Sequence, residues 1–102
     1  MIKLTHIKVG GIKFRLMFVP RIEIHEGADA EIIFPSAQLR VADDLRGDKI
    51  WEAIIHEIVE IINESHELKL PHHKIMTLGA AIHQVMVDNK LDPVREGEPL
   101  EN

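Results

Sequence analysis

The sequence predicts a single α+β domain, in which an N-terminal antiparallel β-hairpin and a third strand pack on two antiparallel helices. Three observations lead to this prediction. Apolar and polar residues alternate on both sides of Gly10-Gly11, as in a hairpin. Residues 50–65 form a wide apolar face at helical spacing, and residues 72–89 carry a narrower apolar stripe. A helix face that covers one face of an antiparallel sheet produces a two-layer domain.

The size and composition of the chain agree with this fold class. The 102 residues correspond to one domain, and with only three Phe and one Trp its core must be aliphatic. There is no cysteine, which excludes disulfide bonds and thiolate metal sites. The net charge of −5 provides no electrostatic reason to expect nucleic acid or an anionic membrane as a partner. No apolar run approaches the roughly 20 residues that cross a bilayer, so we expect a cytoplasmic protein.

The first two strands are predicted on either side of a tight turn. Residues 4–9 are expected to form one strand, and residues 12–18 alternate apolar and mostly basic side chains in a clear period of two. Gly10 and Gly11 tolerate the positive φ that a two-residue hairpin turn requires. Pro20 is expected to end this hairpin.

The next segment is predicted to contain one more strand. Residues 21–25 could extend the sheet or form an irregular connection, and residues 30–34 are expected to be the third strand, closed by Pro35. Residues 36–49 hold several acidic residues and an Arg-Gly-Asp run, so we predict a loop there.

Two helices and a tail complete the predicted domain. Asp48 is a candidate N-cap for the helix over residues 50–65. A linker of about six residues ends at Pro71 and should make the two helices antiparallel neighbours. We place the domain at residues 1–90. Residues 91–102 contain two prolines and four acidic residues, and we predict a mobile acidic tail.

The main chemical signal lies on the polar face of the first helix. His56 and Glu60 are four residues apart, so their side chains can reach a common point, and Glu57 follows the histidine directly. The string is one letter away from the HExxH helix of zinc proteases. In HExxH the Glu after the first His activates a zinc-bound water, and Glu57 has that position. A His and a Glu one turn apart are also common on a solvated helix face, where they need no metal.

A third ligand would have to come from outside this helix. His72, at the start of the second helix, is the best candidate, because that end should lie beside the end of the first helix. His66 in the linker could swing in, and His73 points in a less suitable direction. His83 lies some 16 Å further along the second helix and is predicted to be too far away.

These residues resemble a family of small phage- and prophage-encoded zincin-like proteins, related in pattern to the ImmA/IrrE and SprT-like metallopeptidase domains. The resemblance runs from about Gly11 to Asn89. It covers the hairpin, the turn and third strand at residues 27–32, the helix with IIHEIVEII, and a second helix that ends in Gln-x-x-x-Asp-Asn at Gln84 to Asn89. It implies a minimal metallopeptidase-like fold in a host-cell cytoplasm.

The resemblance also implies roles for individual residues. His56 would be the first zinc ligand, Glu57 the general base, and His72 the third ligand. Glu60 stands where the family has its second histidine. A carboxylate there adds negative charge, which should raise the pKa of the bound water and weaken its activation. The resemblance therefore implies zinc binding with weak or lost peptidase activity. The change at Glu60 leaves three possibilities: an altered His/Glu/His site, weaker metal binding, or a scaffold that has lost its metal.

An alternative from a different class is a non-catalytic binding or inhibitor protein. Its acidic helix face and acidic tail would engage a basic partner, which could be a host or phage protein or peptide. A homo-oligomer is also conceivable, because exposed aliphatic residues near Met17 and at residues 22–24 could support pairing through a sheet edge.

Overall fold

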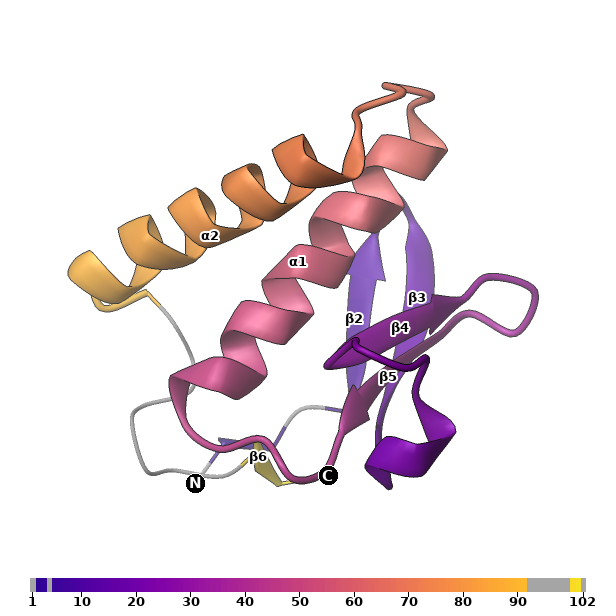
Figure 1. The fold of residues 1–102 in the computed structure, drawn as a ribbon, viewed down its shortest axis with the longest axis vertical. Coiled ribbons are helices and arrows are strands. Elements are labelled where there is room, and N and C mark those ends of the chain that lie inside the picture. Colours follow the sequence, from indigo (N-terminus) through magenta and orange to yellow (C-terminus); the bar gives the residue numbers. More distant parts are fainter. Residues whose placement is uncertain (1, 4, 92–99, 102) are drawn as a thin grey trace.

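The computed structural model describes residues 2–3, 5–91 and 100–101, and it confirms the α+β fold class (Figure 1). A four-stranded sheet with the order β2-β3-β5-β4 lies against one helix, α1, and a second helix, α2, packs on α1. The elements of this domain are β2 (His6–Val9), β3 (Ile12–Val19), the 3-10 turn η1 (Arg21–Glu23), β4 (Ala30–Ile33), β5 (Gln38–Ala42), α1 (Asp48–Ser65) and α2 (His72–Asp88).

The predicted hairpin is confirmed. Strands β2 and β3 are antiparallel, and Val9 pairs with Ile12, so that Gly10 and Gly11 form a two-residue turn. Both glycines have positive φ, at 58° and 83°. Two positive φ values in a two-residue loop match the right-handed twist of the flanking strands. The turn therefore sets the register that directs Phe14 and Leu16 into the core.

The predicted loop over residues 36–49 is wrong, because it contains β5. This strand lies between β3, to which it is parallel, and β4, to which it is antiparallel. The sheet is therefore mixed, and the predicted third strand, β4, is an edge strand that pairs with β5 and not with the hairpin. Leu39 and Val41 are fully buried while Gln38 and Arg40 are only partly covered. That alternation is visible in the sequence, but the acidic run after Ala42 led to the loop assignment.

Residues 21–25 form the irregular connection, one of the two possibilities that the sequence left open. They contain η1, which is held by the side chain of Arg21. Its guanidinium group donates to both carboxylate oxygens of Asp44, at 2.7 and 2.8 Å, and to Asp29 at 3.1 Å. A planar guanidinium matches a carboxylate with two parallel hydrogen bonds. This contact ties the turn before β4 to the loop after β5.

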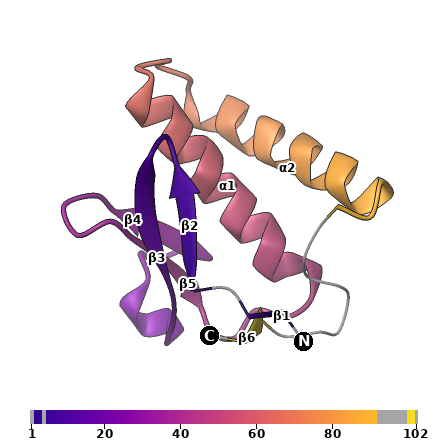
Figure 2. The same ribbon diagram turned by 180° about the vertical axis from the view of Figure 1, so that it is seen from behind.

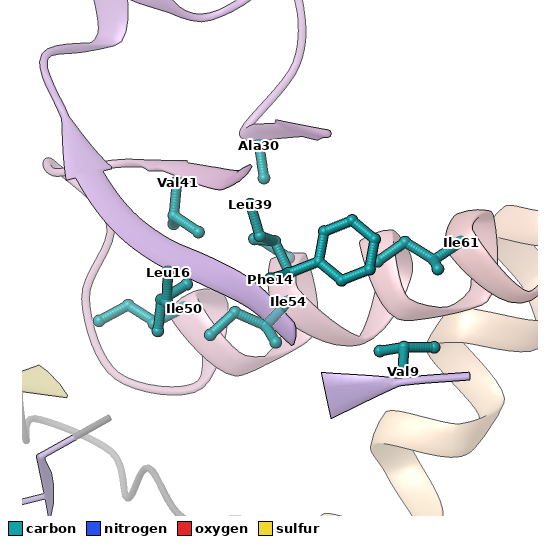
Figure 3. Packing of buried hydrophobic residues seen from close by; sticks show 10 residues of the cluster. Val9, Phe14, Leu16, Ala30, Leu39, Val41, Ile50, Ile54 and Ile61 are labelled. Carbon is teal, nitrogen blue, oxygen red and sulfur yellow. The ribbon is translucent and has the colours of Figure 1, made fainter. Parts of the chain in front are cut away.

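The core lies between the sheet and α1. Figure 3 shows Ile50, Ile54 and Ile61 of α1 on the side that faces Leu39 and Phe14 of the sheet. Leu39, Ile54 and Ile61 are completely buried, and the core is aliphatic apart from Phe14. Each fully buried aliphatic side chain contributes about 1.5–3 kcal/mol to folding. This packing fixes the rotation of α1, and with it the direction in which its polar face points.

Helix α1 begins at Asp48, one residue earlier than it would if Asp48 were the N-cap. Gly47, with φ 59°, occupies the N-cap position, and the start of the helix has no side-chain cap. The prediction that Asp48 is the N-cap is therefore wrong. Asp48 instead lies in the first turn, where a negative charge interacts favourably with the positive end of the helix dipole.

The second helix runs back along the first, as predicted, but it packs mainly on α1 and not on the sheet (Figures 1 and 2). Pro71 directly precedes α2 with extended backbone angles. Gly79 of α2 lies against the backbone of α1, where a Cβ atom would come within 3.3 Å of the His56 Cα. Gly79, the point of close contact between the helices, thus lies beside the candidate ligand His56.

The two ends of the described chain form a short separate pair. Strand β1 (Ile2–Lys3) pairs in parallel with β6 (Leu100–Glu101). The predicted mobile tail, residues 91–102, falls largely on positions 92–99 and 102, which lie outside the described residues. In the described part of the chain, neither helix has the length and apolar character that crossing a membrane requires.

Candidate metal centre

Three side chains predicted as metal ligands lie together at the junction of the two helices. The ligand atoms of His56, Glu60 and His72 all fall within 4.8 Å of one another. The imidazole rings of His56 and His72 meet edge to face, with their centroids 5.7 Å apart and their planes at 71°. His56 and Glu60 are half-buried and His72 is exposed, so the group opens to solvent on one side.

Local and long-range features together place these residues. His56 and Glu60 share a face of α1 because they are one helical turn apart. His72 reaches them because the linker folds back tightly. The side-chain oxygen of Asn63 accepts a hydrogen bond from the backbone N–H of Leu70 at 2.9 Å, which anchors the linker to the last turns of α1. Helix α2 then starts at His72, and the close contact at Gly79 brings it near His56.

The other candidate histidines do not join this group. His66 ends α1 as its exposed C-cap residue, and His73 is exposed on the next position of α2. His83 is buried further along α2, where its Nδ1 lies 3.8 Å from a carboxylate oxygen of Glu52. Of the alternatives that the sequence left open for the third ligand, the structure brings His72 to His56 and Glu60.

Glu57, the predicted general base, is a buried carboxyl group beside the three ligands. Its side chain is only 7% exposed, and it forms no hydrogen bond or ion pair with any other described residue. Its pKa is raised from 4.5 to about 8, mainly by burial and in addition by the nearby carboxylates of Glu60 and Glu31. A charged carboxylate without partners is costly in a low-dielectric site, so the proton is retained.

A cleft runs past this group between the helices and the edge strand β4. It consists of two hollows, of about 330 and 560 Å³, which share His56, Glu57 and His72. Ala28 and Ala30, beside β4, line both hollows from the opposite wall. Neither hollow is lined by Lys or Arg, whereas acidic side chains line both: Asp29, Glu52 and Glu57 in the smaller, and Glu31, Glu57, Glu60 and Glu64 in the larger.

The wall formed by β4 was not predicted from the sequence. Glu31 lies on this strand, 3.1 Å from Arg40 of β5, and its carboxylate is close enough to affect Glu57. No local pattern in the sequence links residues 28–31 to the helix at His56. The link arises because β4 is the edge strand of the sheet that α1 covers.

The three donors together could hold a metal ion. Zinc takes imidazole nitrogen and carboxylate oxygen at about 2.0–2.2 Å, so the donors of a tetrahedral site lie about 3.4 Å apart. The present spread of up to 4.8 Å is larger, and rotation of the exposed His72 side chain would reduce it.

A comparison of the chain with protein-family models, curated proteins and solved structures gave no significant match. The resemblance to phage-type zincin-like proteins therefore stays a prediction, and the function has to be argued from the site itself.

Proposed function

We propose that this protein binds one zinc ion through His56, Glu60 and His72, with a residual capacity for metal-dependent hydrolysis of peptides. The observation that supports this proposal most strongly is the meeting of three donor atoms from two helices within 4.8 Å. His56 and Glu60 lie together because of their spacing on α1. His72 follows Glu60 by 12 positions in the chain and lies beside them only because of the tertiary fold. If His56 and Glu60 were only solvent-exposed residues of a helix, no third donor from another helix would be needed beside them.

The charges around the group favour a cation. The carboxylates of Glu60 and Glu31 lie close enough to Glu57 to disfavour its ionisation. A divalent cation at the ligands would offset this repulsion. The two neutral imidazoles favour zinc or a related transition metal over magnesium or calcium, which prefer oxygen ligands only.

Glu57 has the placement that a general base requires. It follows His56 directly, lines both hollows of the cleft, and has a pKa near the operating range of an acid–base catalyst. Zinc, when bound, would supply Lewis-acid activation of water and of a substrate carbonyl group. The negative charge of Glu60 would weaken that activation, and we therefore propose low activity.

The cleft also suggests the form of the substrate. Strand β4 is an edge strand, and the backbone groups along its outer side are available to pair with an extended chain. An extended peptide can add to such an edge through main-chain hydrogen bonds. The acidic lining favours peptides that carry Lys or Arg.

The same acidic lining supports a second candidate function, in which the protein binds a basic partner without catalysis. In that case the cleft would act only as a complementary surface. Substitutions of His56 and Glu57 distinguish the two functions, because binding by a purely electrostatic surface does not depend on an individual metal ligand or general base.

Metal content tests the proposed function directly. We expect untagged protein, purified without chelator, to contain about one zinc per chain by mass spectrometry. His56→Ala should contain none, because it removes the ligand at the centre of the group. Circular dichroism should show that the variant remains folded. If the parent protein holds no zinc, or if His56→Ala retains it, the proposed site is wrong.

Hydrolysis is tested with Glu57→Gln. We expect the zinc-loaded parent to cleave a library of basic fluorogenic peptides slowly. Glu57→Gln should cleave them at least about 100-fold more slowly than the parent, because loss of a general base typically lowers the rate by this factor or more. The variant should keep its zinc. Equal rates in both proteins would remove Glu57 from the mechanism. Zinc binding without any cleavage would favour the non-catalytic function.

A further inference from the structure

Helix α2 carries a stripe of exposed apolar residues that nothing in the described part of the chain covers. Leu78 and Ile82 are each 43% exposed, and Val85 is 56% exposed. Single exposed apolar residues are ordinary, but several along one helix mark an interaction surface. The residues of α2 that are buried are different ones, Ile75, Gly79 and His83.

The exposed stripe points away from the metal centre. At 100° per residue, Leu78 and Val85 lie about 100–120° around the helix from Gly79 and about 140–160° from His83, the residues that are buried. His72 shares the side of α2 that faces α1 and contacts His56. A partner on the stripe would therefore leave the cleft open, and this surface is independent of the proposed function.

Two residues of the stripe, Leu78 and Val85, belong to a longer set with the spacing of a coiled-coil seam, which does not include Ile82. Lys74, Leu78, Ala81, Val85 and Asp88 follow one another at intervals of four, three, four and three. All five are exposed. This is the a and d pattern of a heptad, about 21 Å long from end to end. Ala81 stands at the centre, with Leu78 and Val85 on either side of it. The oppositely charged Lys74 and Asp88 stand at the two ends.

That arrangement is self-complementary under a two-fold axis. We propose that two copies of this chain associate through antiparallel packing of their α2 helices, with the two Ala81 residues at the dyad. Lys74 then stands level with Asp88 of the partner copy, and Leu78 lies within one residue, about 1.5 Å, of the level of Val85 of the partner copy, each contact occurring twice. Parallel packing would instead bring lysine to lysine and aspartate to aspartate.

The charge pattern argues for a second copy over an unrelated partner. Lys74 has no ion pair within the described residues, and Asp88 accepts a hydrogen bond only from Gln84 of its own helix, at 2.7 Å. Both charges are free to pair across the interface. Because one helix from each chain forms the contact, the interface is small, and association should depend strongly on concentration.

Sedimentation velocity tests the proposal on the full chain. We expect a concentration-dependent shift from monomer to dimer between about 1 and 200 µM, the range of a small interface. Leu78→Glu should keep the protein monomeric at the highest concentration. Ile22→Glu is the matched control, because Ile22 is 92% exposed but lies on η1, and it should dimerise like the parent.

Charge exchange tests the antiparallel geometry. Lys74→Asp and Asp88→Lys should each weaken the dimer about tenfold or more, because each change places like charges together twice. The double variant should restore dimerisation, since it re-forms both pairs. Lys74→Asp places a negative charge near the N-terminus of α2, and Asp88→Lys places a positive charge at its C-terminus. Both charges interact favourably with the helix dipole, so the monomer should remain folded. A parent that stays monomeric, or a double variant no better than the singles, would overturn the proposal.

Discussion

His72→Ala is expected to lower the affinity for zinc by about 100-fold or more, whereas His73→Ala should leave it unchanged. The loss follows because His72 is the ligand that α2 contributes, and even outer partners of metal ligands are worth 10- to 100-fold. The two histidines are adjacent and exposed on the same first turn of α2. Their removal should therefore have similar, small effects on folding, and only the metal should distinguish them.

The affinity is best measured by competition with a chromophoric chelator at fixed pH. Thermal unfolding provides a second measurement, because an ion that binds only the folded state raises the melting temperature with its concentration. Zinc should raise the melting temperature of the parent and of His73→Ala, and not that of His72→Ala. Equal affinities in the two variants would show that α2 contributes no ligand at this position.

Glu57→Gln is expected to stabilise the metal-free protein at pH 8 by about 2–4 kcal/mol, and much less at pH 5. The pKa of Glu57 rises from 4.5 to about 8 on folding, first because of burial and then because of Glu60 and Glu31. Between these two values the folded state holds a proton that the unfolded state has lost. Stability from this group is therefore fully present below pH 4.5 and is lost as the pH rises through 8.

Urea unfolding at pH 5, 6, 7 and 8 in the presence of EDTA measures this effect. Glu64→Gln is the matched control, because Glu64 is an exposed carboxylate near the end of the same helix. The difference between Glu57→Gln and the parent should grow with pH, whereas Glu64→Gln should follow the parent. All seven histidines are present in all three proteins, so the difference isolates Glu57. Parallel pH curves for Glu57→Gln and the parent would show that Glu57 ionises normally.

The features that were predicted correctly depend on short spacings in the chain. The Gly10-Gly11 turn, the apolar face of α1, and the proximity of His56 to Glu60 each arise within a few residues. A hairpin turn and a helical turn have the same geometry in any protein, so a local pattern is sufficient to predict them. The α+β class followed because these elements have one obvious way to bury their apolar faces.

Strand β5 shows where local patterns fail. Its five residues alternate polar and apolar side chains, but the segment is short and an acidic run follows it, so the local pattern did not outweigh the loop assignment. It becomes the centre of the sheet through pairing with β4, whose partner residues lie 5 to 11 positions away in the chain, and with β3, whose partner residues lie 23 positions away. Strand formation depends on such non-local partners more than helix formation does.

The sequence by itself determined the hairpin, the two helices, and two of the three donors of the candidate metal site. Only the tertiary structure decided that His72, and neither His66 nor His73, meets them, and that Glu57 is buried against β4. The physical reason is that the rotation of α2 is set by long-range contacts: Gly79 against His56, and Asn63 with Leu70. The spacing of residues along a helix is a local property, whereas the face that meets a neighbouring element depends on how the whole chain packs.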